Sequence, residues 1–277
     1  MQSEAKISDF QATVWRYYRE HGRHDLPWRS SEPDGSFDPY KILVSEIMLQ
    51  QTQVPRVIPK YHEFLERFHS FTALAGAPLS DVLRVWNGLG YNRRAKFLWQ
   101  CARQVVAIHG GQPPRTTAGL VALPGIGPNT AGAILAYAFN QPVIFIETNI
   151  RTVFIHHFFS GQQGVDDRRI LDLVAQTLPD NPREWYWALM DYGSSLKQKL
   201  GNLNTLSKHY VKQSRFEGSK RQIRGQVLRV LGEQPRTAAQ LSSEIADERL
   251  AGVLNDLVKE SLITCIKGRY RLAGEPD

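Results

Sequence analysis

The stretch that decides the fold is LPGIGPNTAGAIL, residues Leu123–Leu135. Gly125 and Gly127 stand two positions apart, after an apolar pair and before a run of small and apolar residues that is typical of a helix start. Glycine permits a tight backbone turn and presents no side chain that would block a close approach. We interpret the stretch as a helix–hairpin–helix whose outward-facing amides suit a nucleic-acid phosphate. An ordinary glycine-rich connection between two helices is the alternative.

Helical periodicity dominates the sequence on both sides of this stretch, as far as about residue 210. Clusters of Gly, Pro and Asn, such as WNGLGYN, HGGQPP and FNQP, separate the helices. The best candidate is YKILVSEIMLQQTQV, which follows Pro39. Further helices are expected at residues 10–21, 57–67, 79–86, 93–108, 116–122, 128–138, 146–158, 168–178 and 182–193. Strands and helices do not alternate here, so this part is predicted to be all-α and not a doubly wound parallel sheet.

The pattern changes near residue 212. KQSRFEGSK is polar, and residues 212–220 are therefore a candidate linker. Three short helices are expected after it, at residues 222–231, 237–245 and 249–260, and LITCIKGRYRLAG then alternates about a central KG, which predicts a β-hairpin. Three helices and a hairpin are the outline of a winged helix. Residues 218–277 hold 10 basic and 8 acidic side chains, a net +2, so charge alone leaves both a DNA partner and a protein partner open.

Composition limits the class of protein. Lys plus Arg number 34 and Asp plus Glu 27, so the formal charge of the 277 residues is +7, which favours a polyanionic partner. No run approaches the roughly 18 apolar residues of a membrane span, and MQSEAKISDFQ does not resemble a secretory signal. The only two cysteines, Cys101 and Cys265, are too few for a disulfide framework, a thiolate zinc site or an iron–sulfur cluster. A soluble protein of a reducing compartment is expected.

Two carboxylates are candidates for chemistry. Glu46 lies among apolar residues of its expected helix, and apolar surroundings disfavour ionisation, which would make it a general acid near neutral pH. A solvated helix face is the alternative for Glu46. Glu147 follows the apolar run PVIFI and precedes Thr148 and Asn149. It would either stabilise positive charge on a reacting sugar or cap the following helix.

Six stretches together resemble a known family: LPWR (Leu26–Arg29), DPYKILVSEIMLQQTQV (Asp38–Val54), WNGLGYNRRAKFL (Trp86–Leu98), LPGIGPNTAGAIL, ETN (Glu147–Asn149) and MDYGSSL (Met190–Leu196). They resemble the helix–hairpin–helix DNA glycosylases related to endonuclease III, and within that superfamily the MutY adenine glycosylases. The resemblance covers about residues 9–210. It implies an enzyme that flips one nucleotide out of duplex DNA and hydrolyses its N-glycosidic bond.

The resemblance also implies roles for individual residues. Glu46 aligns with the acid that protonates the departing purine, and Glu147 with the aspartate that stabilises the sugar cation. Gln51 resembles the residue that fills the gap left by the flipped base. The remaining implied contacts are Leu26, Trp28 and Arg29 in the base pocket, Gly125, Gly127 and Thr130 on a backbone phosphate, and Tyr91 and Asn149 on DNA.

Several positions depart from the family pattern. Asn129 replaces the lysine of the bifunctional enzymes, so a Schiff base and lyase activity are not expected. Glu147 is one methylene longer than aspartate. The four cluster cysteines are absent, and Lys197, Lys199, Lys208 and Lys212 are candidates to replace the basic cluster loop in holding DNA. One aromatic of the family's GLGYY is lost at Asn92, and the usual 8-oxoguanine-sensing domain is not recognisable, which weakens the case for an 8-oxoguanine:adenine substrate.

We therefore predict an all-α, two-lobed helix–hairpin–helix glycosylase with a small winged-helix-like (α+β) domain. The expected parts are one lobe of residues 1–30 and 142–211, a helical barrel of residues 31–141, the linker 212–220 and the C-terminal domain 221–277. The predicted function is a monofunctional glycosylase acting on adenine in a mismatch. The alternatives are a uracil, thymine or other damaged-base glycosylase, and a DNA-binding protein without catalysis. We expect a monomer that binds double-stranded DNA, carries no cofactor or metal, and works in the cytoplasm (the bacterial nucleoid) or another DNA-containing compartment.

Overall fold

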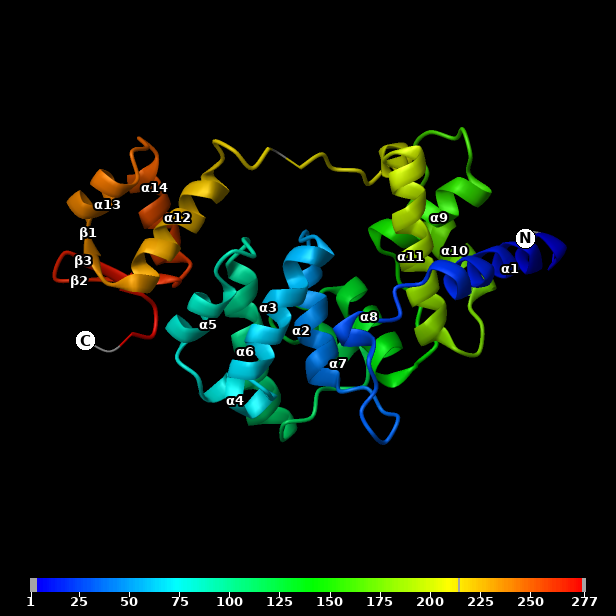
Figure 1. Ribbon diagram of the computed structural model, residues 1–277, viewed down its shortest axis with the longest axis horizontal. Coiled ribbons are helices and arrows are strands. Elements are labelled where there is room, and N and C mark those ends of the chain that lie inside the picture. Colours follow the sequence, from blue (N-terminus) through cyan, green and yellow to red (C-terminus); the bar gives the residue numbers. More distant parts are fainter. Residues whose placement is uncertain (1–3, 214, 276–277) are drawn as a thin grey trace. The chain divides into compact units, whose positions relative to one another are not determined.

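Helices make up most of the chain, as the periodicity predicts (Figure 1). The computed structural model describes residues 4–213 and 215–275. Its contacts form two compact units. Unit 1 contains Met1–Ile42, Arg115–Val121 and Ile126–Lys212, and unit 2 contains Leu43–Pro114, Ala122–Gly125 and Gln213–Asp277. Among the described residues, no helix is both long and apolar enough to span a bilayer.

All named elements of unit 1 are helices. These are α1 (Glu4–His21), η1 (Pro27–Arg29), α7 (Thr117–Val121), α8 (Pro128–Phe139), α9 (Thr148–Phe158), α10 (Asp167–Thr177), α11 (Pro182–Leu200) and η2 (Leu203–Leu206). Helix α11 packs against α1, α8 and α9. In its core, the ring of Phe10 in α1 lies 5.9 Å from that of Trp185 in α11 and 5.2 Å from that of Phe154 in α9. Burial of these rings holds the N-terminal helix against helices from much later in the sequence.

The boundaries of the two units differ from those of the predicted lobes. Helix α8 belongs to unit 1, although the prediction placed it in the barrel of residues 31–141. The physical reason is its burial, since every residue from Ala131 to Ala138 is buried and α8 packs against α11.

Helix α2 (Pro39–Leu49) passes from unit 1 into unit 2, where α3 (Val54–Arg67), α4 (Phe71–Gly76), α5 (Leu79–Trp86) and α6 (Arg93–His109) follow it. Helix α6 packs against α4 and α5. The core of this helical part contains the fully buried rings of Phe64 and Trp86, whose centroids lie 6.1 Å apart. The bounds of α5 agree with the predicted helix at residues 79–86.

The C-terminal domain has the predicted winged-helix arrangement. It consists of α12 (Lys220–Glu233), β1 (Arg236–Thr237), α13 (Ala238–Glu244), α14 (Leu250–Lys259), β2 (Ile263–Ile266) and β3 (Arg269–Leu272). The strands form an antiparallel sheet in the order β1-β3-β2 (Figure 1). Lys267 and Gly268 both have positive φ, 49° and 75°, which is the geometry of a tight two-residue hairpin loop. The sequence predicted the three helices and the hairpin but not β1.

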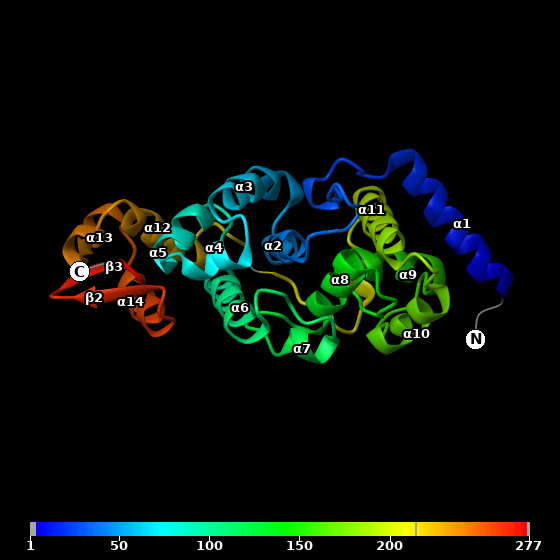
Figure 2. The same ribbon diagram turned by 90° about the horizontal axis from the view of Figure 1, so that it is seen from below.

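The C-terminal domain packs onto the helical part of unit 2. Helices α12 and α5 lie side by side in both ribbon views (Figures 1 and 2) and are in contact. Arg84 of α5 donates from Nε to the carbonyl of Gly232 at 2.9 Å and forms an ion pair with Glu275. Lys96 of α6 donates to the carbonyl of Glu260 at 2.5 Å. The predicted linker therefore leads to a domain that is docked within its own unit.

Candidate active site and nucleic-acid interface

The hairpin stretch has the backbone that its glycines predict. Gly125 is exposed and has a φ of +79°, and a Cβ there would lie 2.6 Å from Cβ of Phe97. Gly127 is the N-cap of α8, with open space around it, and Pro128 opens the helix. The first amides of a helix have no partner within the helix, so the exposed start of α8 offers hydrogen-bond donors and a partial positive charge. The half-buried Thr130 lies in this first turn.

Glu147 occupies the N-cap of α9. Its Oε2 accepts a hydrogen bond from the backbone amide of Asn149 at 2.9 Å. Burial raises the pKa of Glu147, while the amides of Asn149 and Thr148 and the positive charges of Arg151 and Lys197 favour the ionised form and oppose that rise. The carboxyl group therefore caps α9 in surroundings that both oppose and favour its ionisation.

Close backbone approaches fix the position of Glu147. A Cβ on Gly193 of α11 would lie 2.2 Å from the carbonyl oxygen of Asn149, so α11 packs directly against the start of α9. A Cβ on Gly132 of α8 would lie 2.6 Å from Cβ of Phe145, two residues before Glu147. Glycine at these two positions is what lets α8 and α11 approach the segment that carries the carboxylate.

Asn129 lies near the backbone of the segment that carries Glu147. Its Oδ1 is 3.5 Å from the backbone amide of Ile146, which immediately precedes Glu147. The structure thus brings two of the predicted catalytic positions, Asn129 and Glu147, into one part of unit 1. Asn149 also lies here, with its side-chain amide 4.0 Å from the sulfur of Met190. Thr148, the residue between Glu147 and Asn149, is exposed.

Glu46 belongs to the unit 2 part of α2. Its side chain is half-buried, and its neighbours Leu43, Val44, Ser45, Ile47 and Met48 are buried. Glu46 is thus less buried than the residues on either side of it in α2.

Gln51 and Tyr91 share an unusual backbone geometry. Each has a positive φ, 54° for Gln51 and 46° for Tyr91, which non-glycine residues adopt only when their surroundings impose it. Gln51 is exposed and Tyr91 is half-buried. Both are residues that the sequence assigned to DNA contact, and the structure places both in short loops of unit 2.

Arg94 ties these two loops together, and the sequence analysis missed it. The side chain is 9% exposed and donates to the carbonyls of Ile47, Met48, Gln50, Leu89 and Gly90 and to the hydroxyl of Thr52, at 2.6–3.3 Å. Burial lowers its pKa to about 10, so the guanidinium stays charged at neutral pH. The available signal was a charged residue on the face of α6 that also carries the buried Leu98 and Cys101.

The segment predicted to line the base pocket lies in the core of unit 1. Leu26, Trp28 and Arg29 are 6%, 6% and 8% exposed. Arg29 forms a two-pronged ion pair with Asp191 of α11, with N···O distances of 2.7 and 2.9 Å, and Arg23 binds the same carboxylate. Burial opposes ionisation of Asp191, but the hydrogen bonds and charges of the two arginines hold its pKa below the usual value. The guanidinium of Arg29 is thus used to join η1 to α11.

The residues present do not fit an iron–sulfur cluster. Such a cluster needs about four cysteine thiolates, and the whole chain contains two. Cys101 is buried in α6, where burial raises its thiol pKa to about 12, and Cys265 is exposed on β2. After α11, the buried Asn204 of η2 instead donates to the hydroxyl of Thr152 in α9 at 2.8 Å. Protein packing occupies this part of unit 1.

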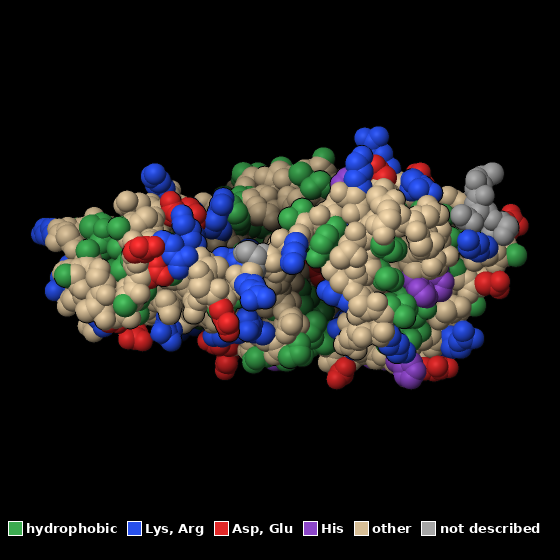
Figure 3. Space-filling view, turned by 90° about the horizontal axis from the view of Figure 1, so that it is seen from above, with side chains coloured by type: hydrophobic (Ala, Val, Ile, Leu, Met, Phe, Trp, Pro, Cys, Tyr) green, Lys and Arg blue, Asp and Glu red, His purple; other side chains and the backbone are tan. Residues whose placement is uncertain are grey.

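The four lysines proposed to replace the basic cluster loop are exposed. Lys197, Lys199, Lys208 and Lys212 all have exposed side chains, and Lys208 lies 3.7 Å from Asp166. On the face of the C-terminal domain seen at the left of Figure 3, acidic and basic side chains are intermixed. In that domain Arg224 and Arg236 pair with Glu260 and Glu244.

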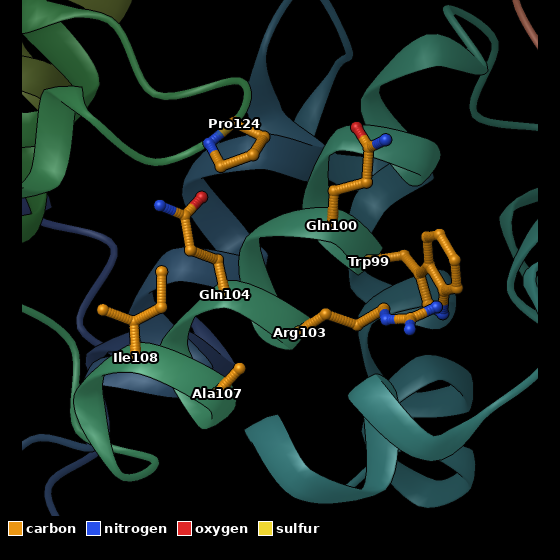
Figure 4. A pocket seen from close by; sticks show the side chains of 7 residues that line it. All are labelled: Trp99, Gln100, Arg103, Gln104, Ala107, Ile108 and Pro124. Carbon is orange, nitrogen blue, oxygen red and sulfur yellow. The ribbon is translucent and has the colours of Figure 1, made fainter.

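A separate surface groove of about 560 Å³ runs along α6 (Figure 4). It is lined by Trp99, Gln100, Arg103, Gln104, Ala107, Ile108 and Pro124. The guanidinium of Arg103 lies 4.7 Å from the centroid of the Trp99 ring. The lining includes none of the predicted site residues.

Comparison with known proteins identifies the family. The model described as "HhH-GPD superfamily base excision DNA repair protein" matches residues 44–174. The adenine DNA glycosylase of Mycolicibacterium smegmatis is 34% identical over 293 residues, covering 97% of this chain and 97% of that enzyme. The structure of a thermostable thymine-DNA glycosylase has a TM-score of 0.59 at 25% identity, over 69% of this chain and 87% of that chain. A non-covalent endonuclease III–DNA complex shares the fold, with a TM-score of 0.57 at 17% identity, over 71% of this chain and 86% of that chain.

The helical fold, the hairpin and the family model define a base excision DNA repair protein of the HhH-GPD superfamily. Within it, this chain belongs to the family of the adenine DNA glycosylases. The alignment with the mycobacterial enzyme includes nearly all of the C-terminal domain, because it covers 97% of the chain. The winged-helix domain is therefore compatible with membership of this family.

Proposed function

We propose that this protein is a DNA glycosylase of base excision repair that flips a mismatched adenine out of duplex DNA and hydrolyses its N-glycosidic bond. The observation that carries the proposal is the 34% identity to an adenine DNA glycosylase over nearly the full chain, combined with a carboxylate, Glu147, at the start of α9. An everted base is required because the glycosidic bond is inaccessible in a stacked duplex.

The proposed chemistry uses two carboxylates in different roles. Glu46, protonated before reaction, donates its proton to a ring nitrogen of adenine, so that the base leaves neutral with the electron pair of the broken bond. Glu147, ionised, stabilises the positive charge that develops on the sugar. Water then adds to the sugar carbon and loses a proton, which leaves an abasic site and free adenine. Glu147 caps α9 through the amide of Asn149, although its side chain is one methylene longer than that of aspartate.

Asn129 makes the proposed reaction monofunctional. An amide cannot form the Schiff base through which lysine-bearing relatives cut the strand, so hydrolysis without lyase activity follows. Its position near the amide that precedes Glu147 supports a role beside the reacting sugar.

The remaining residues are assigned to DNA binding. Gly125, Gly127 and Thr130 bind a backbone phosphate through their amides, Gln51 fills the gap in the stack, and Tyr91 and Asn149 contact the strand. The exposed lysines at the end of α11 and beyond add electrostatic attraction. Leu26, Trp28 and Arg29 contribute to the base pocket as a fixed wall. The protein works as a monomer, without an iron–sulfur cluster, in the cytoplasm or another compartment that contains DNA.

A panel of oligonucleotide duplexes tests the proposal. Purified protein is incubated with adenine opposite 8-oxoguanine or guanine, with uracil or thymine opposite guanine, and with hypoxanthine and oxidised pyrimidines, and alkali then cleaves any abasic product. Cleavage of the adenine strand only after alkali is expected. Strand breaks before alkali would contradict the monofunctional assignment. Excision of thymine alone would favour the second candidate, which the likeness to a thymine-DNA glycosylase structure suggests, and binding without any product would favour a non-catalytic protein.

A further inference from the structure

The C-terminal domain reaches the loop that carries Tyr91. Arg221, in the first turn of α12, donates from Nη1 to the hydroxyl of Tyr91, and its guanidinium lies 5.2 Å from the centroid of the Tyr91 ring. Gln213, seven residues before the start of α12, donates to the same hydroxyl and also to Oε1 of Gln51, the latter at 3.2 Å. Gln213 and Arg221 together thus contact both Gln51 and Tyr91, two loop residues with positive φ.

Tyr91 is held from two sides within unit 2. Arg94 of α6 lies 5.6 Å from the ring centroid of Tyr91 and binds the carbonyls of the two preceding residues, Leu89 and Gly90. Arg221 holds the far end of the same side chain. A backbone conformation that is unfavourable for tyrosine persists only where such contacts over-determine it. The contact from α12 therefore contributes directly to the order of this loop.

We propose that Arg221 is a positioning residue, which fixes Tyr91 and with it the loops of Tyr91 and Gln51 in the conformation that enters duplex DNA. The inference rests on the proposed function, because it assumes that these loops probe DNA. Its physical basis is preorganisation, since loops that are already ordered lose less conformational entropy when DNA binds. The winged-helix domain thereby acts on the glycosylase region through an intramolecular contact, in addition to any contact of its own with DNA.

The test uses full-length Arg221→Met, Tyr91→Phe and the double variant, with Arg229→Met as the matched control because Arg229 is exposed on the same helix. The substrate is a duplex whose target adenosine carries a 2′-fluoro group that prevents excision, next to a 2-aminopurine that fluoresces when the bases unstack. Stopped-flow fluorescence gives the rate of unstacking, and thermal denaturation checks folding. Arg221→Lys keeps a charged donor and tests rescue.

We expect Arg221→Met and Tyr91→Phe each to slow unstacking about three- to tenfold, the effect of one hydrogen bond from a charged donor at a half-exposed site. The double variant should be no slower than the slower single variant, because both changes remove the same contact. Arg221→Lys should recover part of the rate, and Arg229→Met should match the wild type.

Other outcomes would overturn the inference. Additive effects of the two changes, or a loss of affinity with a smaller salt dependence, would show that Arg221 acts on a phosphate instead of Tyr91. Faster unstacking in Arg221→Met would show that the contact restrains the loops. The readout needs no excision, so a protein that unstacks the base normally and releases none refutes the proposed function without refuting this inference.

Discussion

Replacing Arg94 with Met is expected to lower the free energy of unfolding of unit 2 by about 3 kcal/mol. The change removes the donor for six acceptors. The hydrogen bonds to the carbonyls of Ile47, Met48 and Leu89 are buried and the other three are part-buried. Each buried acceptor left without a partner costs about 1–2 kcal/mol, so the three cost about 3–6 kcal/mol. Relief of the buried charge offsets part of this sum.

Urea denaturation followed by tryptophan fluorescence measures this change, because the Arg94 guanidinium lies 5.3 Å from the Trp86 ring. Arg93→Met is the control, since Arg93 is the exposed neighbour on α6. The free energy of unfolding of Arg94→Lys should lie between those of the wild type and Arg94→Met, because lysine keeps the charge and lacks the planar guanidinium. A loss below about 1 kcal/mol for Arg94→Met, or one equal to that of the control, would refute the reasoning, because desolvation of the three carbonyls alone exceeds it.

Two further predictions concern pH. Burial raises the pKa of Glu147, and its ionised form is the active one, so the single-turnover rate should fall on acidification at a pH above the ordinary glutamate pKa of about 4.3. Glu147→Gln should be inactive over the whole pH range. A wild-type rate that does not depend on pH down to about 4 would contradict this prediction. The pKa of Asp191 is lowered, so its ion pairs stabilise the fold fully above the ordinary aspartate pKa of about 3.9, and this stabilisation is lost as the pH falls through the folded-state pKa. Asp191→Asn should therefore be less stable at pH 7, and its free energy of unfolding should fall less steeply on acidification than that of the wild type. Equal slopes for the two proteins at acidic pH would rule this out.

Helices long enough to show apolar periodicity could be predicted from the sequence. Two-residue strands and contacts between distant residues could not. The eight residues of α5 show apolar periodicity, and their bounds agree with the prediction. Strand β1 has only two residues, and two residues carry no period. It exists because Arg236 and Thr237 pair with β3, more than 30 positions later.

The candidate site divides in the same way. Glu147 was proposed from a local motif and Asn129 from the family resemblance. In the structure the two share one part of unit 1, where Gly132 packs against Phe145. The partner of Arg29 is 162 positions away, so its ion pair with Asp191 could not be read from the sequence. Arg94 was overlooked because its role is to bind backbone carbonyls, which no sequence motif displays.

The most direct test of the central claim is to measure free adenine by mass spectrometry in a single-turnover reaction on a duplex with adenine opposite 8-oxoguanine. Wild-type protein should release one adenine per duplex and leave the strand intact until alkali is added. Glu46→Gln, which removes the proton donor but no phosphate contact, should bind the duplex with unchanged affinity and release none. Adenine release by Glu46→Gln at the wild-type rate would contradict the assignment of the acid, and no release by the wild type would contradict adenine excision itself.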